Sequence, residues 1–400
     1  MNNFEFYNPV HIVFGAGEIN RAGALASQLG KQALLVSYQD QAVFDGLIET
    51  ISSSLRDAGV GCTAFRGVNP NPKIGEIEAG VAVARACGAD LVIGLGGGSA
   101  MDAAKLIAAG VFYPGDLWDM VFSRHDNSCQ AVPPTEALPL MMIPTLPATG
   151  SEMNPTAVVT NERTTEKSYT WDACLYPKVS LVDPALTCTL SPYQTACGVA
   201  DTLSHVLEFY LTGFEDAFLN NRLQEGVMLT VMEYAPKVFR DPGDVSSRAH
   251  LQWAAIVALN GWSQPGDGWT PMHQLGHVLS ARYNIAHGAS LAIVMPAWMT
   301  QFYRTRLWSY KALAERIFGV QPEDKTGEQI ALEGITRFKS YLKDIGIEVS
   351  LSQIGVTAGD IPSLVEDVVK VSFGADGKLR SRPPATRQDI NRVFELALNE

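Results

Sequence analysis

The chain has 400 residues, of which 46% are hydrophobic and 18% charged, and it is long enough to form two domains of ordinary size. Its formal net charge of −12 argues against nucleic acid or an anionic membrane as a partner and favours small molecules or other proteins. The six cysteines stand singly, which indicates neither a zinc ribbon nor a disulfide framework. The sequence has neither a signal-peptide pattern at its start nor a run of about 20 apolar residues, so we expect a cytoplasmic enzyme without a membrane span.

The first part of the chain alternates short apolar runs with helical patterns. Residues 32–38, 62–68 and 91–95 predict buried strands, whereas 42–58 and 75–87 carry the apolar spacing of helices. Two later apolar runs, "LPLMMIP" and "VSLVDP", predict further strands that each end at a proline. Strands alternating with helices predict a parallel sheet covered by helices on both faces.

The second part of the chain is predicted to be helical. Ser191, Pro192 and Gln194 form a capping box with proline at the first helical position, so a helix should run from there to about Gly213. Helical periodicity continues to the last helix, for which Thr386 is the expected N-cap. We therefore divide the chain into an α/β dinucleotide-binding domain, residues 1–190, and an all-helical metal-binding and substrate domain, residues 191–400.

The stretch "GLGGGSAMD" joins the third predicted strand to an alanine-rich helix. A glycine-rich turn lets backbone N–H groups approach a phosphate closely, and the positive end of the following helix dipole acts at the same place. Gly94 and Gly96 have the first spacing of the dinucleotide-binding fingerprint, but Ser99 stands at its third glycine. The loop indicates a nucleotide site, and a tight turn without a ligand is the alternative.

The end of the first predicted strand, "VSYQDQ", is where an adenosine ribose would lie. Asp40 is placed to accept hydrogen bonds from a ribose 2′-hydroxyl and to repel a 2′-phosphate, and no Lys or Arg lies between Lys31 and Arg56. This favours NAD over NADP. The alternative is that Asp40 caps the next helix.

Two groups of polar residues fall within apolar helical patterns. Asp201 and His205 are four residues apart and share one face of a helix that is apolar on almost every side. His273 and His277 repeat this spacing, and His287 follows a predicted loop, "RYNIAHG". Together they supply the ligands for one divalent ion and leave one histidine for proton transfer, although Asp201 and His205 could also pair with each other.

Several motifs in order make the chain resemble the iron-containing alcohol dehydrogenase family, in its branch of butanol dehydrogenases and broad-range aldehyde reductases. The resemblance runs nearly end to end, through "FGAGEI", "GGGSAMDAAK", "PTLPATGSEMNPTAVVTN", "LVDPALTCTLSP", "GVADTLSHVLE", "HQLGH" and "AHG". It implies a dehydroquinate synthase-like fold, in which a Rossmann-like α/β domain precedes a helical domain and the site lies in the cleft between them.

The resemblance also implies roles for particular residues. The family's metal ligands fall on Asp201, His205, His273 and His287, and its histidine one turn beyond the third ligand falls on His277, which is the expected catalytic residue. The implied cofactor positions are the phosphate-loop residues with Asp102, the threonines beside the nicotinamide, a lysine toward the ribose, and two leucines against the ring: Gly97, Gly98, Ser99, Asp102, Thr145, Thr149, Lys167, Leu186 and Leu190.

The implied activity is reversible hydride transfer between a nicotinamide cofactor and a small primary alcohol or aldehyde such as butanol or butyraldehyde. The expected metal is iron(II), with zinc(II) second. The family branch carries "GGGS" and basic residues where this chain reads "YQDQAVFD", so NAD is expected, with NADP as the alternative. The family is usually dimeric or larger, and the N-terminal stretch "FYNPVHIVFG" is expected at a subunit interface.

Three other functions compete with this hypothesis. The first is a lyase resembling dehydroquinate synthase, which would need several Lys and Arg for a phosphorylated, carboxylated substrate. Apolar stretches such as "NGW" and "GWTPM" fit small uncharged aldehydes better. The second is a metal-dependent hydrolase, which would act without nicotinamide. The third is a binding protein with a vestigial site, which the presence of all four expected ligands disfavours.

Overall fold

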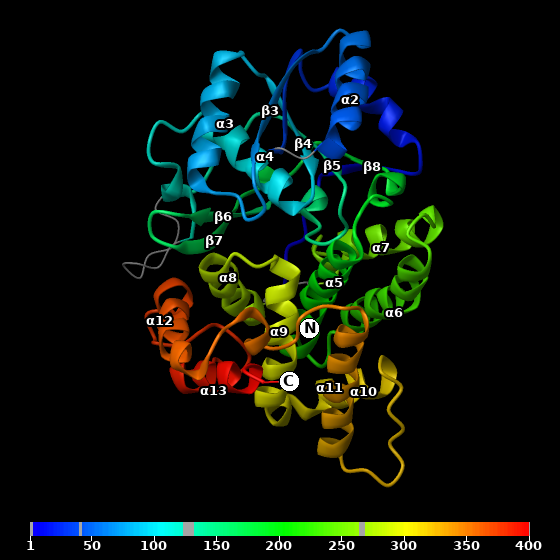
Figure 1. Ribbon diagram of the computed structural model, residues 1–400, viewed down its shortest axis with the longest axis vertical. Helices are drawn as coiled ribbons and strands as arrows, with labels where there is room; N and C mark the ends of the chain where they lie inside the picture. Colours follow the sequence, from blue (N-terminus) through cyan, green and yellow to red (C-terminus); the bar gives the residue numbers. More distant parts are fainter. Residues whose placement is uncertain (1–2, 40–41, 123–131, 264–268, 400) are drawn as a thin grey trace.

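The structure is a computed structural model, and it describes residues 3–39, 42–122, 132–263 and 269–399. In Figure 1 the α/β part forms the upper half of the molecule, and the helices that follow α5 form the lower half. This arrangement confirms the predicted fold class, a Rossmann-like α/β part followed by a helical part.

Six parallel strands form the main sheet, in the order β1-β8-β5-β4-β2-β3. All of these strands except β1 were predicted, and their ends lie within about two residues of the expected bounds. The strands are β1 (His11–Phe14), β2 (Gln32–Tyr38), β3 (Gly61–Val68), β4 (Leu91–Gly96), β5 (Leu140–Pro144) and β8 (Val179–Val182).

Helices cover both faces of this sheet. Successive strand residues point to opposite sides, so the apolar side chains of one strand pack against helices on both faces. Leu34 and Val36 of β2 belong to the apolar cluster that also contains α3 (Ile74–Ala86) and α4 (Gly98–Gly110). Ala33 and Leu35 belong instead to the cluster that includes α1 (Ala22–Ala26) and α2 (Asp45–Asp57). Both faces of the strand are therefore buried, which explains why its sequence is a continuous apolar run.

The strand order reverses between β2 and β4. From β2 the chain moves outward to β3, and it then crosses back over β2 to reach β4 on the other side. In open parallel sheets such a switch point leaves a crevice at the carboxyl ends of the two strands, where ligands bind. The glycine loop begins at this point, directly after β4.

Two features of the sheet region were not predicted from the sequence. The N-terminal stretch forms β1, which pairs with β8 of the same chain at one edge of the sheet, so the glycine loop follows the fourth strand and not the third. A separate antiparallel hairpin, β6 (Thr156–Asn161) and β7 (Glu166–Trp171), lies between β5 and β8 in the sequence.

The helical part begins at α5 (Pro192–Thr212), with the capping box of Ser191 and Gln194 formed as predicted and Gly213 as its C-cap. The capping box of Thr386 and Asp389 also begins the last helix. Within the described residues, no helix combines the length and the apolar character needed to cross a membrane. The other helices are α6 (Phe218–Arg240), α7 (Val245–Ala258), α8 (Pro271–Tyr283), α9 (His287–Phe302), α10 (Leu307–Arg316), α11 (Gly327–Asp344), α12 (Ile361–Ser372) and α13 (Arg387–Ala397).

Candidate metal and nucleotide site

The helix α5 lies in the core of the helical part and carries polar side chains on one buried face. Asp201 is 2% exposed, His205 is 3% exposed, and Glu208, one turn further on, is fully buried. Residues spaced by four and then three positions lie above one another on a helix, so these side chains form a single row. A buried row of this kind requires partners from other elements.

The partners come from α8 and α9. His273 and His277 lie one turn apart in α8. His287 follows a loop as predicted: it is the first residue of α9, after a connection of three residues. The next residue, Gly288, permits α9 to begin against α5, since a Cβ there would lie 2.0 Å from the backbone oxygen of Cys197.

The Nε2 atoms of three histidines lie around one oxygen of Asp201 between these helices. Asp201, His205 and His273 each offer a ligand atom within 4.8 Å of the others. Oδ1 of Asp201 lies 3.6 Å from Nε2 of His205 and 3.7 Å from Nε2 of both His273 and His287. These separations are too long for hydrogen bonds. They are close to the spacing of about 3.4 Å that follows from ligand bonds of about 2.1 Å in a tetrahedral metal site.

Two of these atoms, Asp201 Oδ1 and His273 Nε2, are buried without a hydrogen-bond partner among the described residues. Leaving buried polar atoms unpaired is costly, so the arrangement fits a set of ligands for a cation better than a self-contained ion pair. An oxygen and three imidazole nitrogens suit iron(II) or zinc(II).

His277 lies beside this group. Its ring centroid is 5.3 Å from that of His287 and 6.2 Å from that of His273, and both of its ring nitrogens are buried without a hydrogen-bond partner among the described residues. Burial lowers the pKa of His277 well below its usual range, and nearby Lys167 and His273 act in the same direction. The ring is therefore a neutral acceptor or donor next to the converging atoms.

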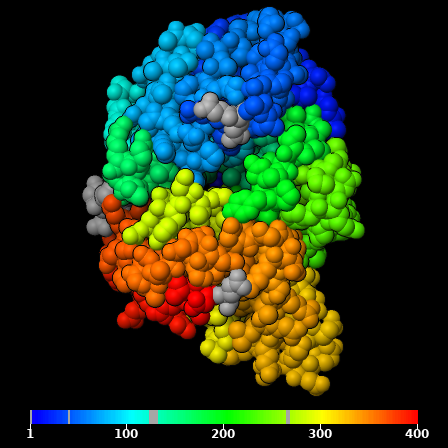
Figure 2. All heavy atoms as spheres, in the orientation of Figure 1, coloured from blue at the N-terminus to red at the C-terminus, as the bar shows by residue number. Residues whose placement is uncertain are grey.

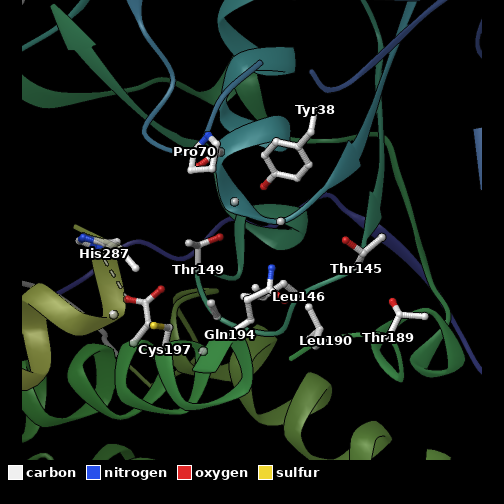
Figure 3. Close-up of a pocket in the computed structure, with 18 of the residues that line it drawn as sticks. Tyr38, Pro70, Thr145, Leu146, Thr149, Thr189, Leu190, Gln194, Cys197 and His287 are labelled. Carbon is white, nitrogen blue, oxygen red and sulfur yellow. Dashed lines mark ion pairs between the residues drawn. The ribbon is translucent and has the colours of Figure 1, made fainter. Parts of the chain in front are cut away.

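A cavity of about 430 Å³, the glycine-loop cavity, opens at the sheet's switch point. In the space-filling view a hollow separates the blue α/β residues from the green and yellow helices (Figure 2). Figure 3 shows Thr145 toward one end of the cavity and His287 at the other, with α5 below. Seven of the predicted cofactor residues line it: Gly97, Gly98, Ser99, Thr145, Thr149, Leu186 and Leu190.

The loop conformation explains its glycines. Gly96 has a φ of +146°, a conformation that residues with a side chain rarely adopt. A Cβ on Gly98, the first residue of α4, would lie 2.5 Å from Cγ2 of Thr149. Glycine is therefore needed at residue 96 for the turn and at residue 98 for the packing of α4 against Thr149.

A second cavity of about 540 Å³, the histidine cavity, adjoins the first. All four histidines of the group line it, and the two cavities share Gly98, Ser99, Thr149 and His287, so the converging atoms lie where the cavities meet. Much of the remaining wall is apolar or aromatic, from Val158, Tyr169, Trp171, Phe209 and Leu259.

The other two predicted cofactor residues line the histidine cavity. Lys167 in β7 donates a 2.8 Å hydrogen bond to Asn71, and burial lowers its pKa to about 8 despite the attraction of Asp201 and Asp102. Asp102 is held by the hydroxyl of Ser151 and the backbone N–H of Val158, at 2.7 and 3.0 Å. Both of its oxygens are therefore already engaged by the protein.

Some residues of the site were not predicted, and one prediction cannot be placed. Asp40 lies outside the described residues. Tyr38, the last residue of β2, points into the glycine-loop cavity beside Gly97 (Figure 3). Glu208 contacts His273 from α5. The sequence could have indicated Glu208, because it lies seven residues after Asp201 on the same apolar helix. A buried carboxylate on the face that carries Asp201 and His205 also requires a partner.

A family model described as iron-containing alcohol dehydrogenase matches residues 9–184, and a model of the C-terminal part of that family matches residues 195–398. The chain belongs to the iron-containing alcohol dehydrogenase family. It is therefore related to oxidoreductases throughout its length, and the resemblance seen in its motifs is confirmed.

Individual relatives specify the branch. The chain is 34% identical over 397 residues to NADH-dependent butanol dehydrogenase A of Clostridium acetobutylicum, with 99% of each chain covered. It is 32% identical to the NADPH-dependent aldehyde reductase YqhD of Escherichia coli, covering 99% of this chain and 100% of that one. The crystal structure of NADH-dependent butanol dehydrogenase A of Thermotoga maritima superposes with a TM-score of 0.93 at 37% identity, covering 100% and 99%. The chain is an oxidoreductase of the butanol dehydrogenase and aldehyde reductase branch.

Proposed function

We propose that the protein transfers a hydride between NAD(H) and a small primary alcohol or aldehyde, such as butanol or butyraldehyde. The observation that carries this proposal is the convergence of Asp201 Oδ1 with three histidine Nε2 atoms at the junction of two cavities. One cavity has the glycine loop suited to a nucleotide, and the other has apolar walls suited to an uncharged substrate.

The residues proposed to hold one divalent ion are Asp201, His205, His273 and His287, with iron(II) as the first choice and zinc(II) as the second. When bound, the ion supplies Lewis acidity and the nicotinamide supplies the hydride. The chain contributes a dry pocket with fixed ligands, since Asp201 and His205 are almost wholly buried.

The nucleotide is proposed to lie in the glycine-loop cavity, with its phosphates at the start of α4 and the nicotinamide toward His287. Thr145, Thr149, Leu186 and Leu190 would line its path, as the resemblance implies, and Lys167 would face the ribose from the histidine cavity. No Lys or Arg is among the described residues that line the glycine-loop cavity, which supports NAD over NADP.

We propose that His277 exchanges the reaction's proton with solvent through one of its ring nitrogens. Neither ring nitrogen has a hydrogen-bond partner among the residues that the structure describes, and the ring lines the histidine cavity. A neutral imidazole next to the reacting group is suited to this role because it can accept a proton at one ring nitrogen and donate one from the other.

The cavity walls argue against a dehydroquinate synthase-like lyase. A phosphorylated, carboxylated substrate needs several cationic side chains, and Lys167 is the single Lys or Arg among the lining residues that the structure describes. A hydrolase has no use for a glycine loop opening toward the same histidines. Neither alternative is supported by a specific contact.

We also propose that the chain divides into two domains near residue 190, that it forms a homodimer or larger assembly, and that it is located in the cytoplasm. Every strand that the structure describes precedes Ser191. Phe4, Phe6 and Tyr7 are about half exposed near the edge strand β1, where a second copy would cover them. Free thiols at the described cysteines suit a reducing compartment. A monomer at micromolar concentration in analytical ultracentrifugation would contradict the assembly.

The proposed activity is tested by supplying the iron-loaded protein with butyraldehyde and either NADH or NADPH and following the absorbance of the reduced nicotinamide. We expect oxidation of the nicotinamide that depends on the aldehyde and is faster with NADH. Absence of oxidation with either cofactor across simple aldehydes would overturn the assignment, and faster turnover with NADPH would overturn only the cofactor preference.

A further inference from the structure

Glu208 is a carboxylate without a role in the ligand set proposed above. It is fully buried in α5, yet it makes three contacts with the start of α8. Its Oε1 accepts hydrogen bonds from the backbone N–H groups of Met272 and His273, at 2.5 and 3.0 Å, and its Oε2 pairs with Nδ1 of the His273 ring. One side chain thus binds both the backbone and the imidazole of a single residue.

The backbone contacts replace a missing cap. Pro271 is the first residue of α8, so the next two N–H groups have no partner within the helix. Thr270, at the N-cap position, makes no side-chain capping bond. Glu208 supplies the acceptor from another helix, and its negative charge is favourable at the positive end of the α8 dipole.

The ring contact determines how His273 presents its other nitrogen. A neutral imidazole carries one hydrogen, and a carboxylate beside Nδ1 holds that hydrogen there. Nε2 is then left as a lone pair, and this is the atom that lies 3.7 Å from Asp201 Oδ1. By contrast, Nδ1 of His287 is buried without a hydrogen-bond partner within the described residues.

We propose that Glu208 is a positioning residue that fixes the tautomer and orientation of His273 for metal binding, while capping α8. The inference rests on the metal site proposed above. A carboxylate behind a ligating histidine raises the basicity of the ligand and restricts its ring, and loss of such a partner typically weakens metal binding about 10- to 100-fold.

Glu208→Gln separates the two tasks. The amide oxygen can still accept from the N–H groups of Met272 and His273, but the amide nitrogen then faces Nδ1 and donates to it. The hydrogen of His273 must move to Nε2, where it points at the metal position. The cap is kept while the lone pair needed for the metal is lost.

The experiment measures zinc(II) affinity of the metal-free full chain by competition with a chromophoric chelator, alongside the melting temperature of the metal-free proteins. Glu225→Gln is the matched control, since Glu225 is also a buried carboxylate of the helical part but bonds to Tyr210 and Arg316 instead. We expect Glu208→Gln to bind zinc roughly 10- to 100-fold more weakly than wild type, and Glu225→Gln to match wild type.

Equal zinc affinity of folded Glu208→Gln and wild type would overturn the positioning role. Failure of wild type itself to bind zinc would instead refute the metal site. If Glu208→Gln does not fold, selective ¹⁵N-histidine labelling of wild type decides, with the His273 signals assigned from a His273→Gln sample. A hydrogen on Nδ1 of the neutral His273 ring in the metal-free protein supports the inference, and a hydrogen on Nε2 overturns it.

Discussion

Nε2 of His287, the first residue of α9, lies 3.7 Å from Oδ1 of Asp201 in the middle of α5. The same oxygen is equally near to His273 of α8, so one carboxylate joins three helices at the centre of the helical part. The histidines whose Nε2 atoms face this oxygen are the proposed metal ligands, whereas His277 is proposed to transfer a proton.

The two histidines of α8 should respond differently to removal. His273→Ala deletes a nitrogen 3.7 Å from Asp201, so the variant should lose bound metal. His277→Ala should keep its metal and turn over roughly 100- to 10,000-fold more slowly, as expected on losing a general acid or base. Metal content by elemental analysis, measured beside kcat, checks both, and loss of metal from both variants would show that His277 is a ligand.

The close approach of α9 to α5 predicts a second effect. In Gly288→Ala the added carbon would lie 2.0 Å from the backbone oxygen of Cys197, which cannot move without shifting α5. Overpacking of this kind costs about 1–3 kcal/mol and should also displace the adjoining His287. We expect a lower melting temperature together with weaker zinc binding. A variant with unchanged zinc affinity would mean that His287 is not held by this contact.

The start of α4 is the place to test nucleotide binding. In Gly98→Ala the new Cβ would lie 2.5 Å from Thr149 and push its side chain toward the cavity. A cost of about 1–3 kcal/mol corresponds to a roughly 5- to 100-fold weaker affinity for NADH, measurable by quenching of protein fluorescence.

Gly226→Ala is the control for this substitution. Gly226 lies in α6, and a Cβ there would meet nothing within 4 Å. This variant should bind NADH normally and gain about 0.5–1 kcal/mol of stability, because alanine favours a helix over glycine. Equal NADH affinity in both variants would place the nucleotide elsewhere.

Much of the site could be predicted because its residues are spaced along helices. The four-residue spacing of Asp201 and His205, and of His273 and His277, places each pair on one face wherever the helix packs. The contact of Glu208 with α8 could not be predicted in this way, since it depends on how α5 and α8 cross. The start of a helix at His287 could not be predicted for a related reason, because the start of α9 is determined by its packing on α5.

The strands, too, could be predicted only where the local sequence determines them. Buried strands such as β2 were predicted from their continuous apolar runs. The short edge strand β1 and the hairpin of β6 and β7 were missed, because partly exposed and polar residues such as His11 and Lys167 interrupt the pattern. Their pairing depends on neighbouring strands, which local sequence does not specify.

Lys167 predicts a pH dependence of cofactor binding. Burial lowers its pKa to about 8, so its positive charge is present below that pH and is lost as the pH rises. If the charge binds the nucleotide, the KM for NADH should rise by up to about tenfold per pH unit above 8. Lys167→Met should show a high KM that does not vary over this range.

Unfolding at high pH would not explain such a rise in the KM for NADH. Between about 8 and the ordinary lysine value of 10.5, the unfolded chain binds a proton that folded Lys167 has released, so this group's contribution to stability increases with pH. A KM for NADH in wild type that is constant from pH 7 to 9.5 would contradict a role for the charge.

The central claim is that hydride transfer depends on one divalent ion held by Asp201 and three histidines. It is tested most directly by titrating the metal-free protein with iron(II) while following NADH oxidation in the presence of butyraldehyde. The activity should rise from a negligible level to a plateau at one ion per chain, and Asp201→Asn should not reach it. Full activity of the metal-free protein, or none at any ion content, would contradict the account.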